Sequence, residues 1–140
     1  MKRVLMFISI ALSLYANDAS KAAKELGYVN SFDKGIAKAQ KEHKLMMLVL
    51  VKNGCSWCKK LERETLSDSF VKDKINNFVR VLLDRNDKMP DYYRTPIVPV
   101  VYFVDPKTKS SVFETAGFRE PNEFLDDIQT AEDDYNALKK

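Results

Sequence analysis

VKNGCSWCKKL, residues 51–61, marks the predicted junction between a buried strand and a helix. The apolar run that leads into it, residues 45–51, is too short for a free-standing helix and is typical of a strand buried on both faces. Helix-forming residues follow, with Cys58, Leu61 and Thr65 spaced so that they share one helical face. The two cysteines are therefore expected where the strand ends and the helix begins.

Cys55, the first of these cysteines, is expected in the first turn of the helix and in reach of solvent. Backbone N–H groups are unpaired there and the positive end of the helix dipole is close, and both favour a thiolate over a thiol. Lys52, Lys59 and Lys60 add positive charge nearby. Because the thiolate is the nucleophilic form, the pattern predicts a reactive sulfur at Cys55.

Cys58 follows nearly one helical turn later, so the two sulfurs can close a small disulfide ring. Such a ring removes little entropy from the unfolded chain, which favours a reversible redox pair over a structural staple. A zinc site needs about four ligands, whereas the chain has two cysteines and one histidine, His43, so no metal site is expected. A c-type haem site needs histidine where this chain has Lys59. A staple and two unrelated buried thiols remain alternatives.

The N-terminus has the pattern of a secretory signal peptide. A basic start at residues 1–3 is followed by the apolar stretch Val4–Leu14 and the small residue Ala16. We expect cleavage after Ala16, which makes residues 1–16 the signal peptide; an uncleaved N-terminal anchor is the alternative. Export would place the protein where disulfides persist, which in a bacterium is the periplasm.

The remaining residues, 17–140, are enough for one ordinary domain with a single core. We expect an N-terminal extension at residues 17–30 and the domain itself at residues 31–140, as a monomer. The formal charge of +3 includes two cations of the signal peptide, so the mature chain is near neutral. Near neutrality argues against nucleic acid or an anionic membrane as the main partner.

Alternating strands and helices are predicted along the domain. A strand, a helix and another strand in succession predict a right-handed parallel crossover, so strands at residues 45–51 and 78–84 should be neighbours. Residues 85–95 are polar and are expected to be irregular. Further strands are expected at residues 28–30, 99–104 and 112–115, the first and last of them at edges of the sheet.

Helices are expected on both faces of this sheet of mixed direction, which gives an α/β fold. Capping residues and helical periodicity place them at residues 18–26, at residues 31–43, from the cysteines to about residue 66, after Ser67 or Asp68, and from Pro121 onward. The side chains expected to be buried by the last two of these helices are Phe70, Val71, Ile75, Phe124, Ile128, Ala131, Tyr135 and Leu138.

Pro99 opens the third of the predicted long strands, directly after Val98. The bond between them could be trans and simply end the loop, or cis, since a cis peptide bond costs little only before proline. A cis bond would leave the backbone N–H and C=O of Val98 free to pair with an extended peptide as an added strand. Composition alone does not decide between these two alternatives.

The strand, Cys-x-x-Cys and helix at residues 45–66, together with the turn at residues 97–99 and Gly117 before the last helix, resemble the thioredoxin family. The resemblance runs from about Ser31 to Leu138. Residues 54–62 resemble the exported thioredoxin-like proteins of bacteria, including SoxW-type periplasmic thioredoxins. The resemblance implies a thioredoxin fold, with a central mixed sheet flanked by helices on both faces.

Roles for single residues follow from the same resemblance. It makes Cys55 the attacking thiolate and Cys58 the resolving thiol, and it needs no cofactor beyond this redox-active pair. Trp57 would contact substrate, or would instead shield Cys58. The substrate groove implied by the family is lined by Trp57, Val98, Gly117 and the cis-proline Pro99.

Several positions differ from thioredoxin itself. Val49 replaces a buried aspartate that helps proton transfer, so we assign no general base. Gly54 stands where thioredoxin usually has tryptophan, and Val100 where threonine often follows the proline. The two residues between the cysteines are Ser56 and Trp57, where thioredoxin usually has Gly-Pro.

The expected function is reduction of protein disulfides by exchange with Cys55 and Cys58, supplied with electrons by a membrane or periplasmic thiol donor. The alternatives are a non-catalytic thioredoxin-fold binding module, a disulfide donor or oxidase, and a thiol reductase of cytochrome c maturation. A copper(I) carrier that uses the two thiolates is a further class.

Overall fold

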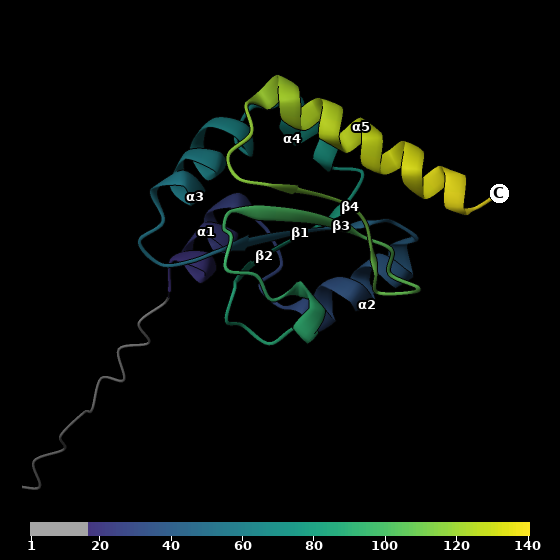
Figure 1. Ribbon diagram of the computed structural model, residues 1–140, viewed down its shortest axis with the longest axis horizontal. Helices are drawn as coiled ribbons and strands as arrows, with labels where there is room; N and C mark the ends of the chain where they lie inside the picture. The colour runs from purple at the N-terminus through teal and green to yellow at the C-terminus, as the bar shows by residue number, and fades with distance from the viewer. Residues whose placement is uncertain (1–16) are drawn as a thin grey trace, which may run out of the picture.

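The computed structural model describes residues 17–140, and the predicted signal peptide at residues 1–16 lies outside the described residues. A sheet of four strands forms the centre, with helices on both of its faces (Figure 1). This arrangement confirms the predicted α/β class with a mixed sheet. Within the described part of the chain, no helix is both long enough and apolar enough to cross a membrane.

The strands lie in the order β2-β1-β3-β4. β1 and β2 are parallel neighbours, as the crossover predicted, and both other pairings are antiparallel. The strand expected at residues 28–30 does not form, so that prediction is wrong. A single bridge, from Val29 to Val81, forms there instead. The strand bounds are Met46–Val51 for β1, Val79–Asp84 for β2, Val100–Val104 for β3 and Ser111–Ala116 for β4.

The helices begin close to where their capping residues predicted. Asn17, Ser31 and Asp68 each accept a backbone N–H in the first turn of the helix that follows. The bounds are Asp18–Leu26 for α1, Phe32–Glu42 for α2, Ser56–Lys60 for α3, Leu61–Thr65 for the π-helix η1, Ser69–Ile75 for α4, Asp91–Tyr93 for the 3-10 helix η2 and Pro121–Leu138 for α5.

β1 is the centre of the core because both of its faces are buried. Its even-numbered side chains pack under α2 and η2, and its odd-numbered side chains pack under the other helices. The cluster on the odd-numbered face includes three alanines of α1, so residues 17–30 contribute to the same core as the rest of the chain. Cys55 and Cys58 belong to this cluster as well.

Two side chains that were expected in the core are exposed. Phe70 is 73% exposed, because the buried face of α4 is set by Val71 and Ile75, and Phe70 lies one residue, about 100°, away from it. Leu138 is 71% exposed, because the last turns of α5 extend past the sheet (Figure 1). The buried stripe of α5 is therefore shorter than its spacing predicted.

The segment expected to be irregular, residues 85–95, contains the short helix η2. It buries Tyr93, whose ring lies 5.7 Å from that of Phe32 and 4.9 Å from that of Tyr102. The Tyr93 hydroxyl donates to the Lys109 carbonyl at 2.8 Å. Long-range contacts of this kind leave no periodic pattern in the sequence, so Tyr93 was not predicted as a core residue.

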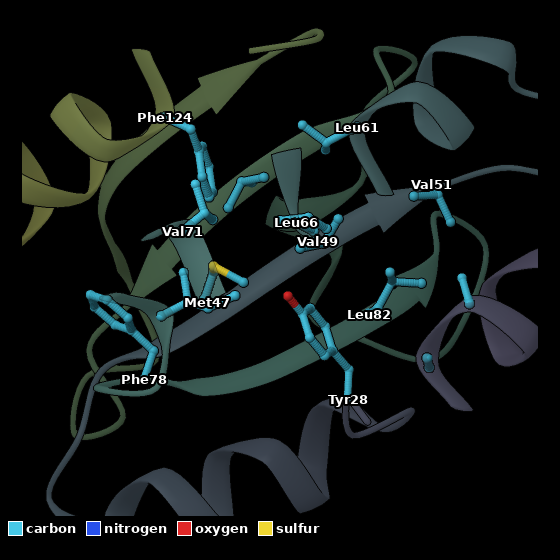
Figure 2. Close-up of a cluster of buried hydrophobic side chains, with 14 of the residues drawn as sticks. Tyr28, Met47, Val49, Val51, Leu61, Leu66, Val71, Phe78, Leu82 and Phe124 are labelled. Carbon is cyan, nitrogen blue, oxygen red and sulfur yellow. The ribbon is translucent and has the colours of Figure 1, made fainter. Parts of the chain in front are cut away.

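Tyr28 buries a hydroxyl among apolar side chains. Figure 2 shows its oxygen pointing into the cluster that contains Met47, Val49 and Leu82. Within residues 17–140 this oxygen has no hydrogen-bond partner. A buried polar group without a partner destabilises the folded state, because it has lost its bonds to water.

Replacing this hydroxyl is expected to stabilise the protein. Tyr28→Phe should raise the free energy of unfolding by about 1 kcal/mol, measured by urea denaturation. Tyr93→Phe is the matched control, since that hydroxyl does have a partner and its loss should lower stability by about 1 kcal/mol. Equal effects of the two substitutions would contradict the prediction.

Candidate active site

The turn between β1 and α3 places Cys55 at the start of the helix. Gly54 has φ +67°, in the left-handed region that glycine adopts without strain, and it turns the chain out of the strand. Cys55 then caps α3, and its sulfur accepts the backbone N–H of Cys58 at 3.1 Å. The predicted position of this cysteine at the helix N-terminus is confirmed.

Cys55 and Cys58 form a disulfide, with their Cα atoms 5.2 Å apart. Cys58 is 1% exposed, whereas Cys55 is 7% exposed. Cys55 is therefore more enclosed than the sequence suggested, but it remains the more accessible of the two. Some surface of the first cysteine is therefore still accessible, while the second cysteine is covered.

The three lysines expected to surround the cysteines are partly neutralised. Lys59 lies 3.8 Å from Glu62, and Lys60 lies 3.8 Å from Glu64. Lys52 is exposed and makes no ion pair within residues 17–140. The positive potential at the sulfurs therefore depends mainly on the helix N-terminus and less on lysine charge than predicted.

The second half of the site is the loop before β3. The Val98–Pro99 peptide bond is cis, one of the two alternatives that the sequence left open. The carbonyl of Pro99 accepts the N–H of Gly117 at 2.7 Å, which ties this loop to the end of β4. Among the described residues, neither backbone polar group of Val98 has a hydrogen-bond partner.

A pocket of about 370 Å³ lies between Trp57 of α3 and the loop before β3. Every residue that the resemblance placed in a substrate groove lines it, although those residues come from three separate parts of the chain. One further residue completes the lining. The lining residues are Trp57, Val98, Pro99, Gly117 and Phe118.

Phe118 was missed by sequence reasoning. Its ring lies 5.9 Å from that of Trp57, and Trp57 is 57% exposed. The Lys60 ammonium lies 4.3 Å from the Phe118 ring centre and 5.3 Å from that of Trp57, so a cation stacks on both rings. An aromatic residue directly after Gly117 was the signal that could have identified it.

The next residue, Arg119, attaches the segment that carries Phe118 to two helices. Arg119 makes two hydrogen bonds to Asp127 of α5, at 2.7 and 3.1 Å. The Thr65 hydroxyl of η1 donates to the Arg119 carbonyl. Because the partners of Arg119 lie in the helices α5 and η1, the loop that carries the aromatic wall of the pocket is anchored at two points.

Glu62 is a buried carboxylate on the cysteine helix. It lies one turn beyond Cys58, in the π-helical segment η1, a type of irregularity that is frequent at functional sites. Burial raises the pKa of Glu62; Lys59 opposes this rise, while Asp18 and Glu25 add to it. The family resemblance places a proton-transfer group only at the position of Val49, so Glu62 was not predicted.

The raised pKa makes the stability contribution of Glu62 depend on pH. Below its unfolded-state pKa, Glu62 is protonated in both states and costs nothing; as pH rises through the folded-state pKa, the cost of burying its charge appears in full. Glu62→Gln should therefore stabilise the protein at pH 7, by at most about 1 kcal/mol, and not at pH 3.5. Thermal unfolding at the two pH values measures this difference; an equal gain at both would contradict it.

His43 lies outside the site, at the exposed C-terminal cap of α2. Across residues 17–140, no three His, Cys, Asp or Glu side chains are grouped as metal ligands would be.

Comparison with solved structures shows thioredoxin folds. A thioredoxin from Thermus thermophilus superposes with a TM-score of 0.70 and 22% identity, over 79% of this chain and 91% of that chain. The reduced C-terminal domain of Neisseria meningitidis DsbD gives 0.55 and 21%, over 83% and 97%. An oxidoreductase named DsbH gives 0.56 and 16%, over 74% and 85%. No curated protein matches the sequence.

A family model gives the same result from the sequence. The model described as thioredoxin-like matches residues 28–106, which is more than half of the chain. The matched range includes both cysteines, β1 and the cis-proline loop. The chain therefore belongs to the thioredoxin-like family.

Proposed function

We propose that the protein is a thiol–disulfide oxidoreductase that reduces protein disulfides. One observation carries the proposal: a disulfide at a helix N-terminus lies beside a loop whose Val98 backbone has no hydrogen-bond partner in the described residues. An extended substrate could pair with Val98 as an added strand and bring its own disulfide to Cys55.

The reaction transfers two electrons through a mixed disulfide. The Cys55 thiolate attacks one sulfur of the substrate disulfide, that bond breaks, and the other substrate sulfur leaves as a thiolate that takes up a proton. Cys58 then loses its proton and attacks Cys55, which releases the substrate as a dithiol and leaves the Cys55–Cys58 disulfide. A donor dithiol must reduce this disulfide before the next cycle.

The surroundings of the sulfurs suit this sequence of steps. The helix N-terminus stabilises negative charge on Cys55 after reduction. Cys58 is 1% exposed, so a substrate sulfur meets Cys55 first. The resolving attack then takes place between neighbours on one helical turn, which makes it intramolecular and fast.

The cellular setting is also a proposal. We infer export to the periplasm through cleavage of residues 1–16, as in SoxW-type periplasmic thioredoxins, and action as a monomer. The partners would be disulfide-containing proteins and a membrane or periplasmic thiol donor, with no cofactor other than the cysteine pair and no nucleic acid. Fractionation of cells that produce the full chain, with N-terminal sequencing of the product, tests export and cleavage together.

Insulin reduction tests the activity. The wild-type protein should accelerate the precipitation of reduced insulin chains beyond the rate of dithiothreitol alone. A binding module without turnover would give no acceleration. An oxidase would instead restore disulfides in reduced, unfolded ribonuclease faster than it reduces insulin, so the two assays separate direction from activity.

Phe118→Ala tests whether the pocket binds substrate. Loss of the aromatic wall should raise the KM for insulin about fivefold and leave kcat nearly unchanged, because the contact is made before the reaction as well as during it. Phe70→Ala is the matched control, since Phe70 is an exposed phenylalanine on α4, outside the pocket. Equal KM values for the two variants would remove the pocket from the proposal.

A further inference from the structure

α1 and the turn that precedes Cys55 exchange two hydrogen bonds. The Asp18 N–H donates to Oδ1 of Asn53 at 2.9 Å, and the Gly54 N–H donates to Oδ2 of Asp18 at 2.9 Å. The two bonds form a reciprocal clamp between parts of the chain that are 35 and 36 residues apart. Gly54 is the residue directly before Cys55, so the clamp acts on the backbone that places the attacking sulfur.

The helix that carries Asp18 is a rigid support. Asn17 caps it by accepting the Ser20 N–H at 2.8 Å, and its alanines pack in the same core cluster as the two cysteines. Asn53 and Gly54 are themselves exposed. The turn therefore has little packing of its own, and its position depends on its two hydrogen bonds with Asp18.

The Asp18 carboxylate also brings negative charge to the cysteine helix, where it contributes to the raised pKa of Glu62. A carboxylate bonded to the residue before Cys55 opposes a thiolate there, which disfavours the dithiol relative to the disulfide. A pair whose dithiol is disfavoured is the stronger reductant. Lys52 directly precedes Asn53 in the chain, and Glu25 on α1 and Lys59 act on the same carboxyl of Glu62 as Asp18 does.

We propose that Asp18 is a positioning residue for thiol–disulfide exchange, which fixes the Asn53–Gly54 turn and makes the cysteine pair more reducing. This inference rests on the proposed function. It gives the N-terminal helix, which precedes the family match at residues 28–106, a role in the chemistry of the site.

Two substitutions separate the charge of Asp18 from its hydrogen bond. Asp18→Asn removes the charge and keeps an oxygen that can accept the Gly54 N–H, whereas Asp18→Ala removes both. Asp33→Asn is the control, because Asp33 is an exposed acid in the first turn of α2 and lies on the other face of the sheet. Glutathione titration gives the equilibrium constant of the pair, read from the fluorescence of Trp57, the only tryptophan.

Both Asp18 variants should shift this equilibrium about fivefold toward the dithiol, or about 20 mV for a two-electron couple. Only Asp18→Ala should also lower kcat for insulin reduction, by about tenfold, since the bond that holds the Gly54 N–H is then lost and only the bond to Asn53 remains. Equilibrium constants equal to that of Asp33→Asn would overturn the charge role. Equal kcat values for the Asn and Ala variants would overturn the positioning role.

The result can be separated from failure of the proposed function. The glutathione equilibrium is measured without a protein substrate, so the shift can appear even if insulin is not reduced. If Asp18→Ala does not fold, as judged by circular dichroism, the Asp18→Asn equilibrium still decides the charge role, and Asn53→Ala, which breaks one of the two bonds and keeps the charge, decides the positioning role through kcat.

Discussion

Cys55→Ser is expected to abolish disulfide reduction, with a loss in kcat/KM of at least about 10³-fold. A serine hydroxyl at the start of α3 remains protonated at neutral pH and cannot form a mixed disulfide. Cys58→Ser should also stop turnover but for another reason, because Cys55 still attacks and the mixed disulfide is then not resolved. Insulin reduction and mass spectrometry of trapped adducts measure the two effects.

The contrast between these variants tests the assigned roles. Cys58→Ser should accumulate adducts linked through Cys55, and Cys55→Ser should accumulate few because Cys58 is covered. The reverse pattern would exchange the two roles. A lack of adducts on Cys58→Ser, with Cys55 fully open to alkylation, would argue against exchange with proteins. Thermal unfolding, compared with that of the reduced wild type, checks that the variants fold. The short Cys55–Cys58 disulfide ring should itself contribute little to stability.

Gly35→Ala is expected to lower the free energy of unfolding by about 1–3 kcal/mol. Gly35 lies on the buried face of α2, where that helix crosses the sheet. An added Cβ would overlap with Cγ2 of Val81 and lie 2.9 Å from the sulfur of Met46. Both of these side chains are fully buried and have no space into which to move.

The expected loss has the opposite sign from the helix propensity of the two residues. Alanine favours a helix over glycine by about 1 kcal/mol, so Ala37→Gly, at an exposed position of the same helix, should lose about that amount. In the double variant Gly35→Ala/Val81→Ala, the added methyl group occupies space that the valine vacates, and the loss should be smaller than the sum of the single losses. Urea denaturation followed by circular dichroism measures these three variants and Val81→Ala alone. A gain in stability for Gly35→Ala would contradict the packing argument.

The parts of this fold that the sequence predicted are those set by local rules. The run before Val51 is apolar on both faces, and the cysteine spacing places one sulfur at a helix start and the other on the same turn. Phe118, Tyr93 and Asp18 were not predicted as contributors, because each acts through contacts with residues far away in the sequence.

Two side chains that were predicted to be buried are exposed, for a similar reason. Helical spacing predicted a buried stripe for all of α5, but a stripe is buried only as far as the sheet beneath it extends, and Leu138 lies beyond that limit. Phe70 was placed inside because it is apolar, although its neighbour Val71 already occupies the inward direction.

The contact of Asp18 with Asn53 and Gly54 affects how the protein should be handled in the laboratory. A purification tag or reporter fused before Asn17 would emerge next to the turn that carries Cys55 and could block docking of large substrates. The opposite end of the chain, after α5, lies far from α3 (Figure 1). Affinity handles, surface immobilisation and fluorescent fusions therefore belong at Lys140.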